Sequence, residues 1–180
     1  MSHPSAQTDR FVHDRLPPPA QLPIFRYDLP ELQLPDQLNL VEELLDKAVS
    51  AKGWGDRPML REAGRTWTYR DAAAEVSRIA QVLTGDLGLV PGNRVLLRAP
   101  NNPMLAACWF GVVKAGGIAV GSMPLLRAPE LRQIIDKAQI SHALCDGRLA
   151  DEMQRAAALC PTLRQLRYFG EGAADASAAE

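Results

Sequence analysis

The sequence predicts an α/β fold in which a parallel sheet with flanking helices is preceded by a proline-rich extended arm and a β-hairpin. Short apolar runs begin at Val95, Ile118, His142 and Leu166, which are 23, 24 and 24 residues apart, and a helical pattern fills each gap. A strand, a helix and a second strand at this spacing form the right-handed crossover unit of a parallel sheet. Seven of the 14 prolines lie in the first 35 residues, so this part can form neither a helix nor a central strand.

These patterns divide the chain into three segments. Residues 1–37 form the proline-rich arm, residues 38–169 form the foldable body, and residues 170–180 carry no large apolar side chain. We therefore predict that the last segment is a disordered tail. The arm does contain apolar side chains, so we expect it to pack along the body. Those side chains are Leu22, Ile24, Phe25, Tyr27 and Leu29.

Two capping boxes mark the starts of the first helices. Asn39 with Glu42, and Thr68 with Asp71, each combine a helix-capping side chain with an acidic side chain three residues later that can bond back to the cap. The second helix is expected to stop near Gly88. Apolar residues recur at helical spacing after each cap. The predicted buried faces are Leu40, Val41, Leu44, Leu45 and Ala48 in the first helix, and Val76, Ile79, Ala80, Leu83 and Leu87 in the second.

The remaining elements follow from turn residues and prolines. Residues 58–61 and 65–68 flank Ala63-Gly64 and are predicted to form the β-hairpin. Proline suits a first helical position, where its missing N–H would be unbonded anyway. The helices between the predicted strands are expected over 103–115, 129–138 and 149–160.

Composition excludes several classes of function. The 180 residues are 47% apolar and 23% charged, as in an ordinary globular protein. The net charge is −1, which argues against nucleic acid as a partner recognised by bulk charge. Three cysteines are too few, and odd in number, for a disulfide framework, so the reducing cytoplasm is the expected location.

No segment reads as a membrane anchor or a secretory signal. Residues 1–15 are polar and lack an apolar centre. The most apolar stretch, 103–126, carries Lys114 in its middle and is interrupted by Gly116-Gly117 and Pro124. A lysine at mid-bilayer costs roughly 2.5–3.5 kcal/mol on insertion scales. A buried helix followed by a buried strand is the better interpretation.

Three arginines follow predicted strands and are the candidate site residues. Arg98, Arg127 and Arg148 come at or after the carboxyl ends of successive strands, the edge where open parallel sheets bind ligands. Together they could hold an anionic ligand. The alternative is that each is an ordinary surface arginine.

Other residues favour structural roles. Gly116-Gly117 precedes a strand and lacks dinucleotide-loop spacing, so it indicates a tight helix-to-strand turn. His142 starts an apolar strand and is interpreted as a core histidine. Cys108 and Cys145 lie in apolar runs and are expected to be inert thiols. Read from its residues alone, the chain has no catalytic constellation.

Two segments resemble core motifs of the AMP-forming acyl-CoA synthetase superfamily. Residues 65–71, RTWTYRD, resemble the first, and residues 111–120, GVVKAGGIAV, resemble the second. The resemblance runs in order over about residues 16–168. The opening, with Leu16-Pro17-Pro18-Pro19 and residues 28–32, is most similar to 2-aminobenzoate–CoA and benzoate–CoA ligases. Supporting segments are residues 91–95, 100–103, 129–131 and 141–144.

The resemblance implies the first part of the large N-terminal domain of an adenylate-forming enzyme. In that family ATP, Mg²⁺ and coenzyme A convert an aromatic carboxylate to its thioester through an acyl-adenylate. The phosphate-binding Ser/Thr/Gly-rich loop and the later nucleotide motifs are missing here, so no catalytic residue is assigned and the segment alone is expected to be inactive. By position, Arg127 and Arg148 are carried over as residues on the coenzyme A side.

A competing hypothesis is an independent α/β module that binds a small anion or a partner protein. The two hypotheses differ in the surface that they predict. A piece of a larger domain leaves apolar helices uncovered and is expected to self-associate through that core, whereas a module has a closed surface. The segment most in need of cover is 103–113, which is apolar on nearly every face.

Overall fold

The computed structural model describes residues 6–24, 26–33, 35 and 37–174. At its centre is a parallel sheet, as the spacing predicted, and its strand order is β4-β3-β5-β6. Two antiparallel strands, β1 and β2, form the predicted hairpin. The strands are β1 Pro58–Glu62, β2 Arg65–Thr68, β3 Arg94–Arg98, β4 Ile118–Ser122, β5 His142–Asp146 and β6 Gln165–Phe169.

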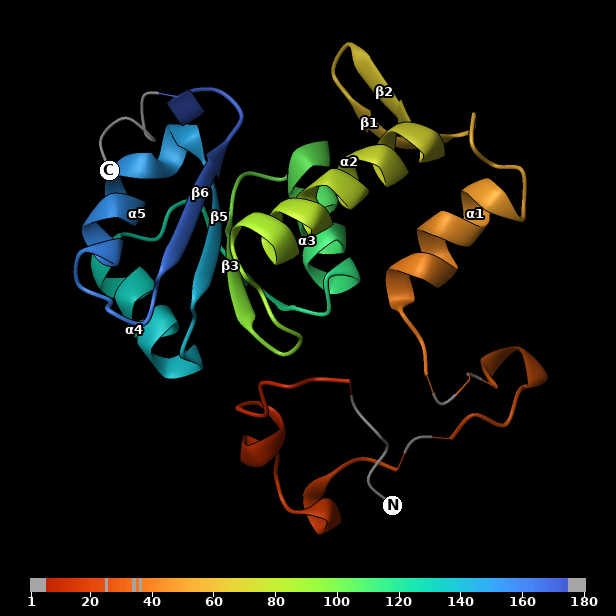
Figure 1. Ribbon diagram of the computed structural model, residues 1–180, viewed down its shortest axis with the longest axis horizontal. Helices are drawn as coiled ribbons and strands as arrows, with labels where there is room; N and C mark the ends of the chain where they lie inside the picture. The colour runs from red at the N-terminus through yellow and green to blue at the C-terminus, as the bar shows by residue number, and fades with distance from the viewer. Residues whose placement is uncertain (1–5, 25, 34, 36, 175–180) are drawn as a thin grey trace.

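Helices cover both faces of the parallel sheet (Figure 1). On one face, α3 (Pro103–Lys114) packs against the sheet and α2 (Tyr69–Gln81) packs against α3. On the other face, α4 (Ala128–Ala138) and α5 (Ala150–Ala157) enclose a second core. The two central strands, β3 and β5, are therefore buried throughout, and the three middle residues of each are apolar.

Local signals account for most element boundaries. The Thr68–Asp71 capping box is present at the start of α2, with the Asp71 N–H donating to Thr68 Oγ1 at 3.1 Å. A π-helical turn, η5 (Val82–Asp86), continues α2, and the chain leaves it through Gly88 at φ 63°. Gly116 adopts φ 80° in the predicted turn between α3 and β4. Such a φ favours glycine, so the interpretation of Gly116-Gly117 as a turn is confirmed.

The first helix departs from its predicted buried face. A π-helical turn, η4 (Glu42–Asp46), leads into α1 (Lys47–Ser50), and this segment packs on α2. Its buried residues are Val41, Leu45 and Ala48, whereas Leu40 and Leu44 are exposed. The expectation that these two leucines belong to the buried face is wrong, because the segment contacts its neighbours along a single narrow stripe. The Asn39 cap is formed, with Oδ1 accepting from the Val41 N–H at 3.0 Å.

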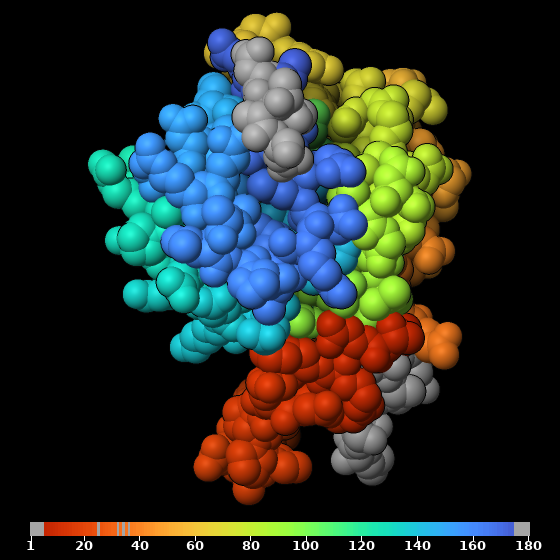
Figure 2. Space-filling model, turned by 60° about the vertical axis from the view of Figure 1, so that its left-hand side comes forward, coloured from red at the N-terminus to blue at the C-terminus, as the bar shows by residue number. Residues whose placement is uncertain are grey.

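Most of the arm lies away from the body (Figure 1). Three short 3₁₀ turns interrupt it, and Figure 2 shows its red atoms as a separate lobe below the body. The expectation that its apolar side chains pack along the body is wrong for Leu22, Ile24, Tyr27 and Leu29, which are all exposed. Phe25, and residues 175–180 of the predicted tail, lie outside the described residues. The three turns are η1 His13–Arg15, η2 Pro19–Gln21 and η3 Pro30–Leu32.

The start of the arm is fixed to the body at the amino end of the sheet. The N–H groups of Thr8 and Asp9 donate to the Pro91 carbonyl at 3.0 and 2.9 Å. The Asp9 carboxylate pairs with the buried guanidinium of Arg94, and the Phe11 ring lies 4.5 Å from that guanidinium. We call residues 8–11 with Arg94 the latch.

The interpretation of His142 as a core histidine is confirmed. It is buried at the start of β5, where Nε2 donates to the Leu87 carbonyl at 3.0 Å and Nδ1 accepts from Ser141 Oγ at 2.8 Å. Burial lowers its pKa below the usual value of 6.5. Across the described residues, no helix is long and apolar enough to cross a membrane.

Candidate functional site

Two hollows lie at the carboxyl ends of the parallel strands, on opposite faces of the sheet. Successive side chains of a strand point to opposite faces, so Leu97 and Arg98 at the end of β3 face different layers. Leu97 lines a hollow of about 600 Å³ on the α3 side. Arg98 lines one of about 330 Å³ on the side of α4 and α5. We call them the apolar hollow and the arginine hollow.

The arginine hollow brings together all three arginines that the sequence selected. Arg98 enters it from β3, Arg127 from the start of α4, and Arg148 from the 3₁₀ turn η6 (Gly147–Leu149). A fourth, Arg155, comes from α5 and was missed. Arg148 belongs to the 3₁₀ turn before α5, so the spacing of seven residues from it to Arg155 is not a helical repeat, and no sequence signal pointed to Arg155. The other lining residues are Pro124, Leu125, Leu126, Leu149, Asp151 and Glu152.

Arg98 is a buried cation held by backbone carbonyls. Its side chain is 2% exposed, and its guanidinium donates to the carbonyls of Met123, Pro124 and Leu126 at 3.1, 3.0 and 2.8 Å. These bonds fix the chain path between β4 and α4. Among the described residues, its Nε has no hydrogen-bond partner. Burial lowers its pKa, but an arginine remains charged at neutral pH.

Arg148 is oriented by the carboxylate of Asp146 at the end of β5. Nε and Nη2 donate to the two carboxylate oxygens at 2.9 and 2.7 Å, a bidentate pair. Asp146 is 2% exposed, whereas half of the Arg148 side chain is exposed. The hydrogen bonds from Arg148 lower the pKa of Asp146 and in turn raise that of Arg148. The guanidinium is therefore fixed in direction and still open to solvent.

Arg127 stands at the start of α4, beside the fourth arginine. Its backbone N–H donates to Glu130 Oε2 at 3.1 Å, which caps the helix. Glu152 accepts from the Ala128 N–H at 2.8 Å and from Arg155 Nη1 at 3.0 Å, so it joins α4 to α5. The Arg127 side chain itself is exposed on the rim of the hollow.

The charges of the arginine hollow suit an anion. Four guanidinium groups line it, against the two carboxylates of Asp151 and Glu152. Glu152 is engaged in the helix contacts described above, and Asp146 lies beneath Arg148. Planar guanidinium groups bind phosphate or carboxylate in a bidentate manner. The hollow can therefore position an anionic group.

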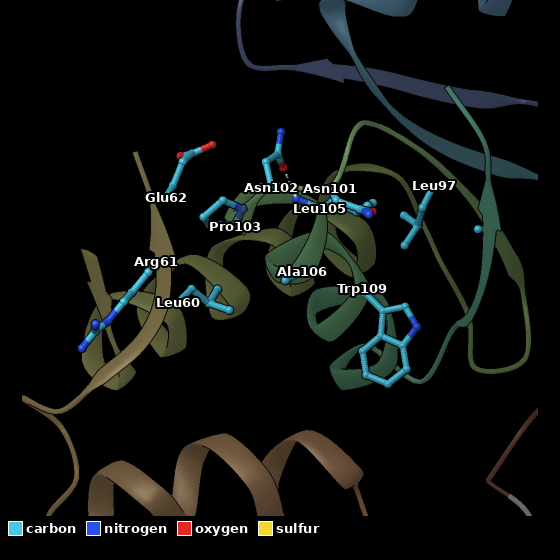
Figure 3. Close-up of a pocket in the computed structure, with 11 residues that line it drawn as sticks. Leu60, Arg61, Glu62, Leu97, Asn101, Asn102, Pro103, Leu105, Ala106 and Trp109 are labelled. Atoms are coloured by element: carbon cyan, nitrogen blue, oxygen red, sulfur yellow. Dashed lines mark hydrogen bonds between the residues drawn. The ribbon is translucent and has the colours of Figure 1, made fainter. Parts of the chain in front are cut away.

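The apolar hollow lies between the hairpin, α3 and β4 (Figure 3). In Figure 3, Trp109 and Ala106 line it from α3, Leu60 lines it from β1, and Leu97 from β3. Trp109 remains 40% exposed. The sequence indicated that α3 is apolar on nearly every face, and it marked residues 103–113 as the segment that a piece of a larger domain would leave uncovered. The polar lining residues are Arg61, Glu62, Asn101 and Asn102.

Cys108 and Cys145 are not candidates for a reactive group in either hollow. Cys145 is buried at the end of β5, and burial raises its pKa to about 12. Burial likewise raises the pKa of Cys108 to about 12. Thiols with such pKa values are poor nucleophiles at neutral pH, and both lie in the core, as the apolar runs around them predicted. Within the part of the chain that the structure describes, no group of three or more His, Cys, Asp or Glu side chains could hold a metal ion.

Comparison with known proteins identifies the class. The model of the family described as "AMP-binding enzyme" matches residues 47–177, so the chain belongs to that family. The structure superposes on an anthranilate CoA ligase, AuaEII, solved with anthranoyl-AMP, with a TM-score of 0.70 and 24% identity over 76% of this chain and 26% of that one. A benzoate CoA ligase from Burkholderia xenovorans LB400 gives a TM-score of 0.67 and 18% identity over 76% and 27% of the two chains.

Sequence relatives are longer than this chain. A long-chain-fatty-acid–CoA ligase of Bacillus subtilis is 34% identical over 115 residues, which is 63% of this chain and 20% of that protein. The chain thus spans between 20% and 27% of the length of these three proteins. The fold is that of the first part of an adenylate-forming N-terminal domain, as the two core motifs predicted.

Proposed function

We propose that this chain is the N-terminal segment of an ATP-dependent aromatic acid–CoA ligase of the cytoplasm, acting on 2-aminobenzoate or benzoate. By itself it neither adenylates nor forms a thioester. Its arginine hollow holds phosphate groups of coenzyme A, with Arg127 and Arg148 as the contacting residues. The observation that carries the assignment is the family match over residues 47–177, which includes both core motifs.

The complete reaction has two steps. The aromatic carboxylate attacks the α-phosphorus of ATP, which gives the acyl-adenylate and releases pyrophosphate. The sulfur of coenzyme A then attacks the acyl carbon, the thiol proton is lost, and AMP leaves. The first step requires cations and N–H donors around the phosphates. The described residues do not fit Mg-ATP, because they include neither a Ser/Thr/Gly-rich loop with a lysine nor an acidic cluster.

The residues of the arginine hollow do fit the phosphates of coenzyme A. The carboxylate of Asp146 fixes the direction of Arg148, so little rotamer entropy is lost when the guanidinium binds an anion. The Arg98 Nε is a buried donor without a partner among the described residues, and Arg127 adds a charge at the rim. These groups would bind and orient coenzyme A, while the thiol chemistry would take place elsewhere in the enzyme.

Calorimetric titration of the purified chain tests this proposal. Mg-ATP, 2-aminobenzoate and coenzyme A are titrated separately, and pyrophosphate release is assayed with all three present. We expect saturable heat with coenzyme A only, and no pyrophosphate release. Arg148→Gln is expected to weaken coenzyme A binding by about tenfold, because one charged hydrogen-bonding contact is worth roughly 1.5 kcal/mol.

Arg132→Gln is the matched control. Arg132 is also an exposed helix arginine paired with a carboxylate, Asp136, but it is not among the residues lining the hollow. If both variants weaken coenzyme A binding equally, the hollow is not the site. Saturable binding of Mg-ATP or of inorganic phosphate in place of coenzyme A would instead favour the independent anion-binding module.

A further inference from the structure

The two edges of the parallel sheet differ in how their backbone groups are satisfied. At the β6 edge, the Gln165 N–H donates inward to the Ser141 carbonyl at 3.1 Å, so the backbone groups of Leu166 and Tyr168 point outward. The Arg167 guanidinium donates to the Leu166 carbonyl at 2.9 Å. A charged side chain therefore occupies this edge, which is a known protection against pairing with another strand.

Among the described residues, no charged side chain is seen to protect the β4 edge in this way. The Ile118 N–H donates inward to the Asn93 carbonyl at 2.8 Å, so Ile118, Val120 and Ser122 bond toward β3. The N–H and C=O groups of Ala119 and Gly121 consequently point away from the sheet. The strand Ile-Ala-Val-Gly-Ser contains no charge and no proline. A Cβ added at Gly121 would meet nothing within 4 Å, so the α3 face of the sheet is open beside this edge.

Apolar side chains continue the open edge. Met123 and Leu125, in the loop after β4, are 62% and 84% exposed. Trp109 lines the apolar hollow together with Gly121, so its indole lies on the α3 side of the same edge. Exposed apolar groups beside an unpaired strand are typical of a contact surface.

We propose that two copies of this chain pair through β4 in an antiparallel, two-fold symmetric arrangement. With Val120 on the two-fold axis, Ala119 of each copy faces Gly121 of the other. Each such pair exchanges two N–H···O=C bonds, which gives four across the interface and satisfies every outward group of Ala119 and Gly121. Both copies then share one eight-stranded sheet, with α3 of each on the same face.

A second copy fits this edge because the outward groups are self-complementary only in the antiparallel direction. A parallel pairing would need a stagger of one residue between the two strands, which no two-fold axis generates. The absence of charge along β4 means that two copies do not repel each other there. The inference uses the backbone of β4 alone and does not depend on the ligase assignment.

Sedimentation equilibrium of the full chain, over about two orders of magnitude in concentration, tests the inference. We expect a monomer–dimer equilibrium with a micromolar dissociation constant, because this short strand pairing is smaller than a standard interface of roughly 800 Å² per partner.

Gly121→Pro removes one outward N–H from each copy and therefore two of the four hydrogen bonds across the interface. It is expected to raise the dissociation constant about 30-fold, at a factor of about five for each bond. Gly121→Ala adds the same Cβ, keeps the N–H, and is expected to change the constant less than threefold.

Hydrogen exchange supplies a second measurement on the unaltered chain. The amides of Ala119 and Gly121 are expected to gain protection as protein concentration rises, while those of Leu166 and Tyr168 at the other edge do not. A chain that stays monomeric, a dimer that Gly121→Pro leaves unchanged, or open-ended growth in place of a dimer would each overturn the proposal. A strand from another polypeptide would protect the same amides only when that polypeptide is added.

Discussion

Two arginines on one strand show how differently a buried cation can be used. Arg94 and Arg98 begin and end β3, are 5% and 2% exposed, and both donate to backbone carbonyls. Arg94 also pairs with the Asp9 carboxylate and is closed over by the Phe11 ring. Arg98 has no carboxylate partner among the described residues and faces a hollow with three further arginines.

The difference predicts a structural role for the arginine at the amino end of the sheet and a ligand-binding role for the arginines at the carboxyl end. At the amino end, the charge is neutralised within the chain, and the latch joins the arm to residues more than 80 positions away. At the carboxyl end, Arg148 pairs with Asp146 and Arg155 pairs with Glu152, but four arginines line the hollow against two carboxylates, so an excess of positive charge remains. The comparison therefore predicts that substitutions at the amino end lower stability, and that those at the carboxyl end lower the affinity for anions.

The largest effect is expected from Arg94→Ala. It leaves Asp9 without its partner and the Ala138 and Gln139 carbonyls without their donor. Breaking one side of a buried pair costs about 3 kcal/mol or more. Urea unfolding followed by circular dichroism measures this change. Arg132→Ala, which breaks an exposed ion pair with Asp136, is the control and should cost less than about 0.5 kcal/mol.

A smaller loss of stability is expected from Arg98→Met. The substitution removes donors from three carbonyls but also removes the cost of burying an uncompensated charge, so we expect a loss of about 1–2 kcal/mol. Pyrophosphate should raise the melting temperature of the unaltered chain and of Arg94→Ala, but not that of Arg98→Met. If Arg98→Met costs as much as Arg94→Ala and still responds to pyrophosphate, the division between the two ends fails.

Acid should act on the amino end in two separate pH ranges. Burial lowers the pKa of His142, so its contribution to stability is complete above pH 6.5 and falls as the pH drops through that value. Burial raises the pKa of Asp9, but hydrogen bonds from the Phe11 N–H, Arg94 and Asn93 lower it overall. Its contribution is present above pH 3.8 and is lost below that value.

Urea unfolding between pH 8 and pH 3 measures both declines in stability. His142→Asn should abolish the first decline in stability and leave the second unchanged. A single decline below pH 4 in the unaltered chain would contradict the role given to His142.

The sequence predicted the strands and helices well because their signals are local. Periodicity, the Thr68 capping box and the Gly116 turn are readable within a few residues of each element. The carboxyl ends of parallel strands meet at one edge, so Arg98, Arg127 and Arg148 could also be predicted to lie together. The hydrogen-bond partners of each arginine could not be predicted, because they depend on the path of a loop or on a neighbouring strand.

The latch illustrates the same limit at longer range. Asp9 and Phe11 lie in a proline-rich segment with no periodic pattern, and nothing near them in sequence points to Arg94. One signal was available in Gly92, which adopts φ 93° and lies where a Cβ would overlap the Asp9 carbonyl oxygen. A glycine before a strand can have several structural roles, so Gly92 could not by itself identify Asp9 as the residue that packs against it. The apolar residues that follow in the arm then suggested a packing against the body that the structure does not have.

The smallest effect that separates the two ends is expected from Phe11→Leu. The Phe11 ring lies between two guanidinium groups, 4.5 Å from that of Arg94 and 3.8 Å from that of Arg15. Leucine keeps much of the apolar contact and removes both cation–π interactions, so we expect a loss of about 0.5–1 kcal/mol. Arg15→Ala removes only the exposed partner and should cost less. Because the latch lies at the amino end, neither variant should alter the response to pyrophosphate. A weaker response in Phe11→Leu would show that the arm controls the arginine hollow as well as the stability of the sheet.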